Sequence, residues 1–201
     1  MRQVRGAHDR ADPRLQTRAD RTVRTNSTAE VTAAMHIEIE RKFLVSSDAW
    51  RPAQVGVRYR QGYLCTDPQR TVRVRIGGDT AILAVKGEGD GLARPEFEFP
   101  IPAADAEQLL ARCCLQPLVE KYRYRIPFAG RIWEIDEFLG ANRGLVLAEI
   151  ELERVDQPVP LPSWVGAEVT ADPRYYNAYL ARHPFSSWAG HDAGHSPARL
   201  L

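Results

Sequence analysis

The stretch that decides the fold reads HIEIERKFLV and runs from His36 to Val45. Successive side chains of a β-strand point to opposite faces of a sheet, so Glu38, Glu40 and Lys42 share one face of this segment. Isoleucine and phenylalanine side chains occupy the other face. A single strand of this kind is typical of a sheet with one solvated face. The same alternation recurs in later segments, and this recurrence argues against a simple solvent-facing strand.

Length, charge and cysteine content restrict the class of protein. The chain has 201 residues and a formal net charge of +1, which suits one domain with a sizeable core. So small a net charge produces no overall field that would draw the protein to nucleic acid or to an anionic membrane. The three cysteines have neither metal-ligand nor disulfide spacing, so we expect a cytoplasmic protein. No apolar run approaches the roughly 20 residues of a membrane span.

The two ends of the chain differ from its middle. Residues 1–34 contain seven arginines but no apolar periodicity, and such a segment cannot bury enough surface to offset the entropy of ordering. We predict a disordered basic extension there, and Met35 is an alternative start of translation. Residues 35–183 form the expected folded domain. The tail at 184–201 is rich in Gly, Ser and Ala, so we predict a flexible segment.

Strand patterns dominate the middle of the chain, and we predict a mainly β (α+β) fold. Seven segments join the first strand: residues 57–64, 71–76, 80–86, 94–101, 118–127, 131–138 and 145–154. Gly-rich turns between several of them indicate an antiparallel meander. Helices are predicted at 103–115, where apolar residues recur at helical spacing, and at 172–182. The adjacent Cys113 and Cys114 fall on the apolar face of the first helix, so we expect them in the core.

Charged residues in these strands alternate as they do in the first. The sets that lie two residues apart, and therefore share a face, are Arg73 and Arg75; Arg94, Glu96 and Glu98; Lys121, Arg123 and Arg125; Glu134 and Asp136; and Glu149, Glu151 and Glu153. Two architectures fit this pattern. A sandwich would bury the apolar faces and leave the charges in water. A barrel of about eight strands would enclose the charges in a space just large enough for its side chains or one small ligand.

A charged barrel interior would need particular occupants. Many buried lysines, arginines and carboxylates are unstable when dry but are tolerable around water, a metal and an anion. Clustered Arg and Lys bind phosphate oxygens, and clustered carboxylates bind hard cations such as Mg²⁺ or Mn²⁺. The enclosed alternative therefore predicts a metal-complexed polyphosphate as the ligand. The alternation alone leaves both architectures open.

Several longer strings of the sequence are distinctive. The ExExK pattern of Glu38, Glu40 and Lys42 stands within IEIERKFLV, and it is followed by RQGYL (60–64), RVR (73–75), the strand-ending Lys86, RPEFE (94–98), EKYRY (120–124), EID (134–136), AEIELE (148–153) and EVTADPRYYN (168–177). In content and order these strings resemble the CYTH superfamily, the triphosphate tunnel metalloenzymes, and most of all its compact bacterial class. The likeness covers about residues 35–183. It implies an eight-stranded antiparallel β-barrel that forms a tunnel with a charged interior, flanked by a few helices.

The resemblance also implies roles for individual residues. The implied metal ligands are Glu38, Glu40, Asp136, Glu149 and Glu151. The implied phosphate-binding residues are Lys42, Arg60, Arg73, Arg75, Lys86, Arg94, Lys121 and Arg123, with Arg125 as a further candidate. Glu96 and Glu98 would orient the basic residues or assist the metal. The catalytic candidates are Lys42, Lys86 and Tyr63. Tyr63 resembles a tyrosine assigned as proton acceptor. A phenol with a pKa of about 10 is a poor base at neutral pH, so the alternative role for Tyr63 is that of an aromatic residue at the tunnel mouth.

The likeness predicts hydrolysis of inorganic triphosphate to pyrophosphate and phosphate with Mg²⁺ or Mn²⁺. Thiamine triphosphatase is one alternative, with Trp133 or Trp164 holding the thiamine ring at the tunnel mouth. A class IV-type adenylate cyclase is another, although no aromatic pair suggests a platform for a nucleobase. A non-catalytic polyphosphate-binding module would use the same tunnel, but loss of the metal carboxylates would mark it, and they are present. The expected partner is a small-molecule triphosphate, not nucleic acid or a membrane, and we expect a monomer or homodimer.

Overall fold

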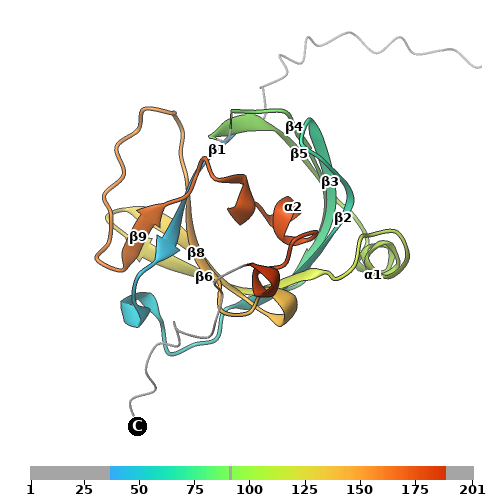
Figure 1. Cartoon of the computed structure of the whole chain (residues 1–201), viewed down its shortest axis with the longest axis horizontal. Helices are drawn as coiled ribbons and strands as arrows, with labels where there is room; N and C mark the ends of the chain where they lie inside the picture. Colours follow the sequence, from blue (N-terminus) through green and yellow to red (C-terminus); the bar gives the residue numbers. More distant parts are fainter. Residues whose placement is uncertain (1–36, 91, 189–201) are drawn as a thin grey trace, which may run out of the picture. The chain divides into compact units, whose positions relative to one another are not determined.

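Nine strands make up most of the structure, a computed structural model that describes residues 37–90 and 92–188 (Figure 1). The strands are β1 (Ile37–Val45), β2 (Val57–Asp67), β3 (Arg70–Gly77), β4 (Thr80–Gly87), β5 (Ala93–Pro100), β6 (Val119–Phe128), β7 (Arg131–Phe138), β8 (Val146–Glu151) and β9 (Val165–Glu168). The α-helices are α1 (Ala103–Arg112) and α2 (Asn177–Leu180). Single 3₁₀ turns lie at Asp48–Trp50, Gly140–Asn142, Pro173–Tyr175 and Phe185–Ser187. The predicted mainly β fold with few helices is confirmed.

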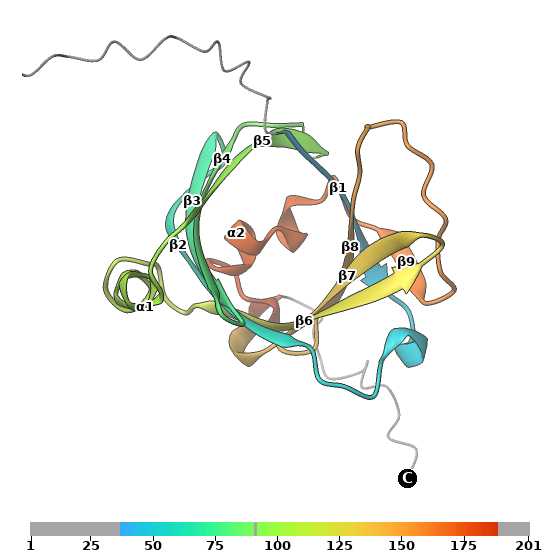
Figure 2. The same ribbon diagram turned by 180° about the vertical axis from the view of Figure 1, so that it is seen from behind.

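Strands β1 to β8 close into an antiparallel barrel. Neighbouring strands follow the order β5-β4-β3-β2-β6-β7-β8-β1, and β5 pairs with β1 to complete the ring. Every pairing around this ring is antiparallel. Figures 1 and 2 show the ring from its two sides. The predicted eight-stranded barrel is therefore correct, and the sandwich alternative is wrong.

Strand β1 carries the organising motif and contacts three other strands. One edge pairs with β8 from Glu40 to Leu44. The opposite edge is divided, because residues 37–39 pair with β5 whereas Phe43 and Val45 pair with β9. The sequence did not predict β9, since its four residues, VGAE, are too few to show an alternating pattern. The division leaves a junction in the middle of β1, next to Lys42.

Glycines close the hairpins where the backbone requires a positive φ. Gly78 has a φ of 56° in the β3–β4 turn, and Gly130 has a φ of 77° in the β6–β7 turn. Side chains with a Cβ atom rarely adopt these angles, whereas glycine does so at little cost. The turns predicted at these two positions are confirmed.

The outer faces of the barrel strands are covered by apolar packing. One cluster includes Phe43, Trp133 and Ile150, packed with Trp164 from the segment that precedes β9. A second joins β3 and β4 to α1, whose Leu110 is buried in it. Burial of one large apolar side chain stabilises a fold by about 1.5–3 kcal/mol. These two clusters therefore lie outside the ring of strands, and this arrangement leaves much of the inner face for charged side chains.

The C-terminal segment lies across one end of the barrel interior, where α2 appears inside the ring of strands (Figures 1 and 2). Leu180 and Ala181 pack there against Tyr63, Val119 and Leu147. The single helix predicted at 172–182 is wrong. The chain forms a 3₁₀ turn and a short α-helix separated by Tyr176, whose backbone is extended (φ −76°, ψ 137°). This break lets the segment turn into the barrel and bury Leu180.

Two further expectations need correction. Helix α1 ends at Arg112, so Cys113 lies beyond its apolar face and is exposed, while Cys114 is half-buried. The packed chain also extends past the expected boundary at residue 183. The ring of Trp188 lies 5.3 Å from that of Tyr175, and both contact the cluster that closes the barrel. The predicted flexible tail therefore begins too early.

The remaining predictions for the chain ends concern residues 1–34 and 189–201, which lie outside the described residues. Within the described part, none of the helices has the length and apolar content to cross a membrane.

Candidate active site

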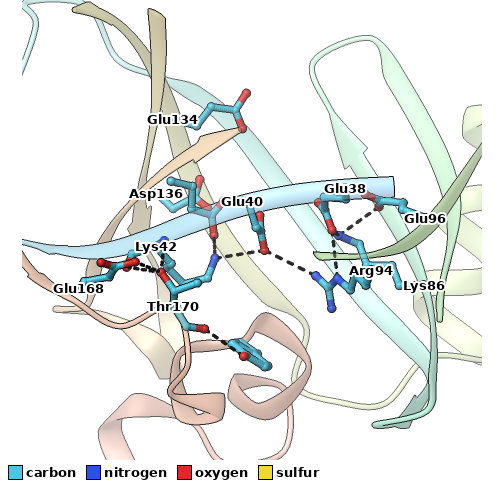
Figure 3. A network of polar contacts seen from close by, with 12 residues as sticks. Glu38, Glu40, Lys42, Lys86, Arg94, Glu96, Glu134, Asp136, Glu168 and Thr170 are labelled. Atoms are coloured by element: carbon cyan, nitrogen blue, oxygen red, sulfur yellow. Dashed lines mark hydrogen bonds and ion pairs between the residues drawn. The ribbon is translucent and has the colours of Figure 1, made fainter. Parts of the chain in front are cut away.

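The strand register places the alternating charges together on the inner face of the barrel. Lys42 lies opposite Glu149, Glu149 opposite Glu134, and Arg123 opposite Asp136. Figure 3 shows Glu38, Glu40 and Lys42 on β1, with their side chains directed to the same side of the strand. The inward-facing charged residues are Glu38, Glu40, Lys42, Arg73, Arg75, Lys86, Arg94, Glu96, Glu98, Lys121, Arg123, Glu134, Asp136, Glu149 and Glu151. Cations and carboxylates are nearly equal in number in this set.

One group of these residues is centred on Arg123. Its guanidinium donates to Asp136 at 2.7 and 2.6 Å and to Glu149 at 2.7 Å, and it also pairs with Glu134. Lys42 pairs with Glu149, and Lys121 pairs with Asp136. Lys121 and Asp136 are almost completely buried, at 1% and 0% exposed. Arg123 therefore has all its nitrogens occupied by carboxylates and acts as the hub of this group.

The electrostatics of this group separate its two lysines. Burial lowers the pKa of Lys42, but Glu149 and Glu40 outweigh it, so the pKa lies above its usual value. Burial lowers the pKa of Lys121 to about 8, because Asp136 is shared with Arg123 and the Arg123 charge repels the ammonium. Burial raises the pKa of Glu149, but Lys42 and Arg123 hold it well below the usual value. Of these two lysines, Lys121 is thus the one that releases its proton more readily.

A second group runs across β3, β4 and β5 to β1. Lys86 donates to Glu38 at 2.6 and 2.8 Å, and Arg94 donates to Glu38 at 3.0 Å. Arg73 donates to both Glu96 and Glu98 at 3.2 Å. Lys86 also pairs with Glu96 at 3.1 Å, so these contacts form one continuous network, and Figure 3 shows its part around Glu38.

The cations of this second group are crowded. Burial and the neighbouring Arg73 lower the pKa of Lys86, and burial, Arg73 and Arg123 lower the pKa of Arg75. The Nε atom of Arg73 is buried and has no hydrogen-bond partner among the described residues. A buried donor without a partner is costly unless a ligand satisfies it. These features indicate a site for an anion.

Carboxylates crowd together around Glu151, and two of them, Glu38 and Glu96, also pair with cations of the second group. Glu151 is exposed at the end of β8 and makes no ion pair in the described structure. Partial loss of hydration and the charges of Glu38, Glu134, Glu40 and Glu96 raise its pKa. A cavity of about 360 Å³ opens at the edge between β1 and β5, lined by Glu38, Glu96, Glu98 and Glu151 and also by Ile37, Phe97 and Phe99, which are exposed and lie on the opposite strand face. Among the described residues, no three His, Cys, Asp or Glu side chains are already grouped to hold a metal. A bound cation would relieve the repulsion around Glu151.

Two predicted phosphate-binding residues do not lie in this interior. Arg60 faces outward and pairs with Glu107 of α1. Tyr59 and Gln61 flank it on β2 and face inward, opposite Lys121 and Val119, so alternation directs Arg60 to the other face. Arg125 follows the inward alternation, but its side chain is 70% exposed and lies 3.9 Å from Glu134. The prediction for Arg60 is therefore wrong, and Arg125 lies at the solvent edge.

Tyr63 is in the interior, but at the closed end rather than at a mouth. It is 4% exposed and packs with Leu180 in the cluster that closes the barrel. Burial raises the pKa of its phenol, although Arg73 and Arg94 oppose this effect. A raised pKa makes the neutral phenol more stable and weakens Tyr63 as a general base.

The sequence did not identify several other residues of the interior. The ring of Tyr59 lies 5.6 Å from the guanidinium carbons of both Arg75 and Arg123, within the range of cation–π attraction. A Cβ atom on Gly77 would lie 2.3 Å from this ring, so the ring packs on the glycine backbone. The alternation of Tyr59 with Gln61 and Tyr63 would have revealed its direction. Thr170 and Tyr176 contact the site from the C-terminal segment; both stand in the distinctive string EVTADPRYYN, but no alternation or spacing within it predicts these contacts.

Comparisons with known proteins agree with this geometry. The family model described as the CYTH domain matches residues 36–176. An inorganic triphosphatase of Acetivibrio thermocellus is 47% identical over 75% of this chain and 97% of its own length. One of Nitrosomonas europaea is 39% identical over 72% of this chain and 96% of its own. The crystal structure of an inorganic triphosphatase that is 36% identical superposes with a TM-score of 0.53, covering 72% of this chain and 93% of that one. The chain belongs to the CYTH domain family.

Proposed function

We propose that the protein hydrolyses inorganic triphosphate to pyrophosphate and phosphate inside the barrel. The observation that carries this proposal is the crowded row of inward cations on β3, β4 and β5, with the unsatisfied Nε of Arg73 among them. Such a row suits a ligand with several anionic oxygens on adjacent phosphates. The two relatives named inorganic triphosphatase support the same substrate.

Phosphoryl transfer requires mainly positioning and neutralisation of charge. Arg73, Arg75, Lys86 and Arg94 would bind the phosphate oxygens, which would replace Glu38, Glu96 and Glu98 as their partners. This exchange of partners keeps the buried cations neutralised with and without substrate. Lys121, with a pKa of about 8, would stabilise the leaving phosphate or donate a proton to it.

The carboxylate side of the interior fits a divalent cation. Glu38, Glu40 and Glu151 would hold it, with Glu149 and Asp136 nearby. The fit rests on the donor set, which consists of oxygens as Mg²⁺ and Mn²⁺ prefer, and on the raised pKa of Glu151. When bound, such a cation neutralises phosphate oxygens and activates water. Before substrate binds, Glu96 and Glu98, which contact Arg73, would orient the basic side of the site.

The structure weighs against an organic substituent on the triphosphate. Trp133 and Trp164, the candidates for a thiamine site, are 0% and 6% exposed and pack against each other outside the ring of strands. Neither ring is available to a thiamine moiety. The ring of Tyr59 faces two guanidinium groups rather than open space, so it offers no platform for the nucleobase of a cyclase substrate. We therefore favour inorganic triphosphate over both alternatives.

The interior also favours an enzyme over a non-catalytic polyphosphate-binding module, because its carboxylates are present and face inward. We infer a small-molecule substrate rather than nucleic acid or a membrane, and a monomer or homodimer. The three free cysteines support a cytoplasmic location.

A substrate panel tests the proposal. The purified protein is incubated with inorganic triphosphate, ATP or thiamine triphosphate in the presence of Mg²⁺, Mn²⁺ or EDTA, and phosphate release is measured. We expect the fastest release from inorganic triphosphate, and none in EDTA. Arg60→Ala is the matched control because this arginine lies outside the barrel, and it should behave as the parent. Preference for an organic triphosphate, or release that is independent of metal, would contradict the proposal.

A further inference from the structure

The junction on β1 leaves the backbone of Lys42 without a regular strand partner on one edge. Strand β5 ends its pairing at Ile39, and β9 begins its pairing at Phe43. The segment that follows β9 takes over this edge. Val169 donates its N–H to the Lys42 carbonyl at 2.8 Å, and Lys42 donates its N–H to the hydroxyl of Thr170 at 3.0 Å. A side chain therefore completes the strand edge directly behind the lysine.

The direction of the Thr170 hydroxyl is set by an acidic neighbour. Thr170 donates its hydroxyl proton to Glu168 at 2.7 Å, which leaves an oxygen lone pair for the Lys42 N–H. Glu168 is itself held by Arg41, which donates to its two oxygens at 2.8 and 2.5 Å. Figure 3 shows Glu168 and Thr170 beside Lys42 on β1. A continuous chain of hydrogen bonds therefore connects Arg41, Glu168, Thr170 and the backbone of Lys42.

The same threonine is tied to the segment that closes the barrel. Tyr176 donates its hydroxyl proton to the Thr170 carbonyl at 3.0 Å. Tyr176 lies in the extended break between the 3₁₀ turn and α2. Thr170 thus connects the C-terminal closure to the strand that carries Lys42.

We infer that Thr170 is a positioning residue, which holds the backbone of Lys42 so that its ammonium is aimed into the site. The inference rests on the proposed function only because hydrolysis of triphosphate is used to measure the effect. The position of Lys42 does not depend on that function: the residue is buried, at 3% exposed, and pairs with Glu149 and Glu40 in the interior. The Lys42 ammonium pairs with Glu149 and Glu40, so the Lys42 backbone must be held where the side chain reaches both carboxylates. Misplacement of a reacting group by about 1 Å costs on the order of 10²-fold in rate.

The test is a double-mutant cycle on the full chain. Thr170→Val removes the acceptor with little change in shape, Thr170→Ser restores it, and Lys42→Ala removes the group that Thr170 is inferred to position. Hydrolysis of inorganic triphosphate with Mg²⁺, calorimetric binding of triphosphate and melting temperature are measured for each protein. Thr66→Val is the matched control, because its hydroxyl contacts only the exposed Arg182 at 3.3 Å in the described structure.

We expect Thr170→Val to lose about ten- to a hundredfold in kcat/KM, Thr170→Ser to stay within about threefold of the parent, and Thr66→Val to match it. In the Lys42→Ala background, Thr170→Val should cause no further loss. If Thr170→Val lowers kcat/KM by the same factor in the Lys42→Ala background as in the parent, the inference is overturned, because Thr170 then acts independently of Lys42. Parental activity of Thr170→Val would also overturn it.

The binding measurement distinguishes failure of the proposed function from failure of the inference about Thr170. If the parent binds triphosphate without hydrolysing it, the proposed function fails, and the same cycle is judged on dissociation constants. If the parent neither binds nor hydrolyses it, both proposals fail. If Thr170→Val does not fold, Thr170→Ala replaces it, since this change also removes the acceptor of the Lys42 N–H. A parental kcat/KM of Thr170→Ala would then contradict the inference.

Discussion

Replacing Arg73 by alanine removes a guanidinium that is only 7% exposed and lies in the middle of the cation row. If its unsatisfied Nε binds a phosphate oxygen, the loss should reduce triphosphate turnover by on the order of 10²- to 10³-fold. This is the range found when one preorganised charge-stabilising donor is removed, and it corresponds to about 2.7–4 kcal/mol of transition-state stabilisation.

The stability of the same variant should fall only moderately. Glu96 keeps Lys86 as a partner at 3.1 Å, and Glu98 keeps Arg75 at 3.1 Å, so neither carboxylate is left alone. The change also removes a positive charge that lowers the pKa values of Arg75 and Lys86. Because relieved repulsion partly offsets the lost pairing, we expect the free energy of unfolding to fall by less than the roughly 3–5 kcal/mol typical when a buried ion pair loses one partner.

The assay combines phosphate release with thermal unfolding, each with and without triphosphate. The parent should be stabilised by triphosphate, and Arg73→Ala should be stabilised less. Arg60→Ala removes the same side chain from the outer face and should leave turnover unchanged. The reasoning is refuted if Arg73→Ala hydrolyses triphosphate at the parental rate and triphosphate stabilises neither protein.

Four further predictions concern other parts of the chain. A protein that starts at Met35 should retain parental activity and melting temperature, and a substantial loss of either would show a structural role for residues 1–34. Tyr59→Leu should raise the KM for triphosphate about tenfold, because the cation–π contacts with two arginines are lost, whereas Tyr59→Phe should leave the KM unchanged. Equal KM values for the two variants in steady-state kinetics would contradict this. Gly77→Ala, which displaces the Tyr59 ring, should resemble Tyr59→Leu in the same assay. Because Lys121 has a pKa of about 8, turnover should fall as pH rises through 8 and the ammonium is lost; a pH–rate profile without this fall would exclude Lys121 as proton donor.

Alternation along each strand was sufficient to predict which charges share a face. Glu38, Glu40 and Lys42 point inward as expected, as do Arg73 and Arg75. Closure could not be predicted from the pattern, because a sandwich and a barrel both bury the apolar faces. The deciding contact is the pairing of β5 with β1, between segments more than fifty residues apart, and no local signal reports it.

The errors have similar physical causes. Arg60 was placed inside because it stands in a motif, although its own strand alternation directs it outward toward α1. The helix predicted at 172–182 breaks at Tyr176 because burial of Leu180 inside the barrel outweighs local helix propensity. Thr170 contacts the backbone of Lys42 across 128 residues of sequence, so only the fold brings it to the site.

Phosphorus NMR of inorganic triphosphate incubated with the protein tests the central claim most directly. With Mg²⁺ or Mn²⁺ present, the triphosphate signals should give way to pyrophosphate and phosphate in equal amounts, and EDTA should prevent this. A spectrum that stays unchanged with either metal would contradict the assignment of the barrel interior as a triphosphatase active site.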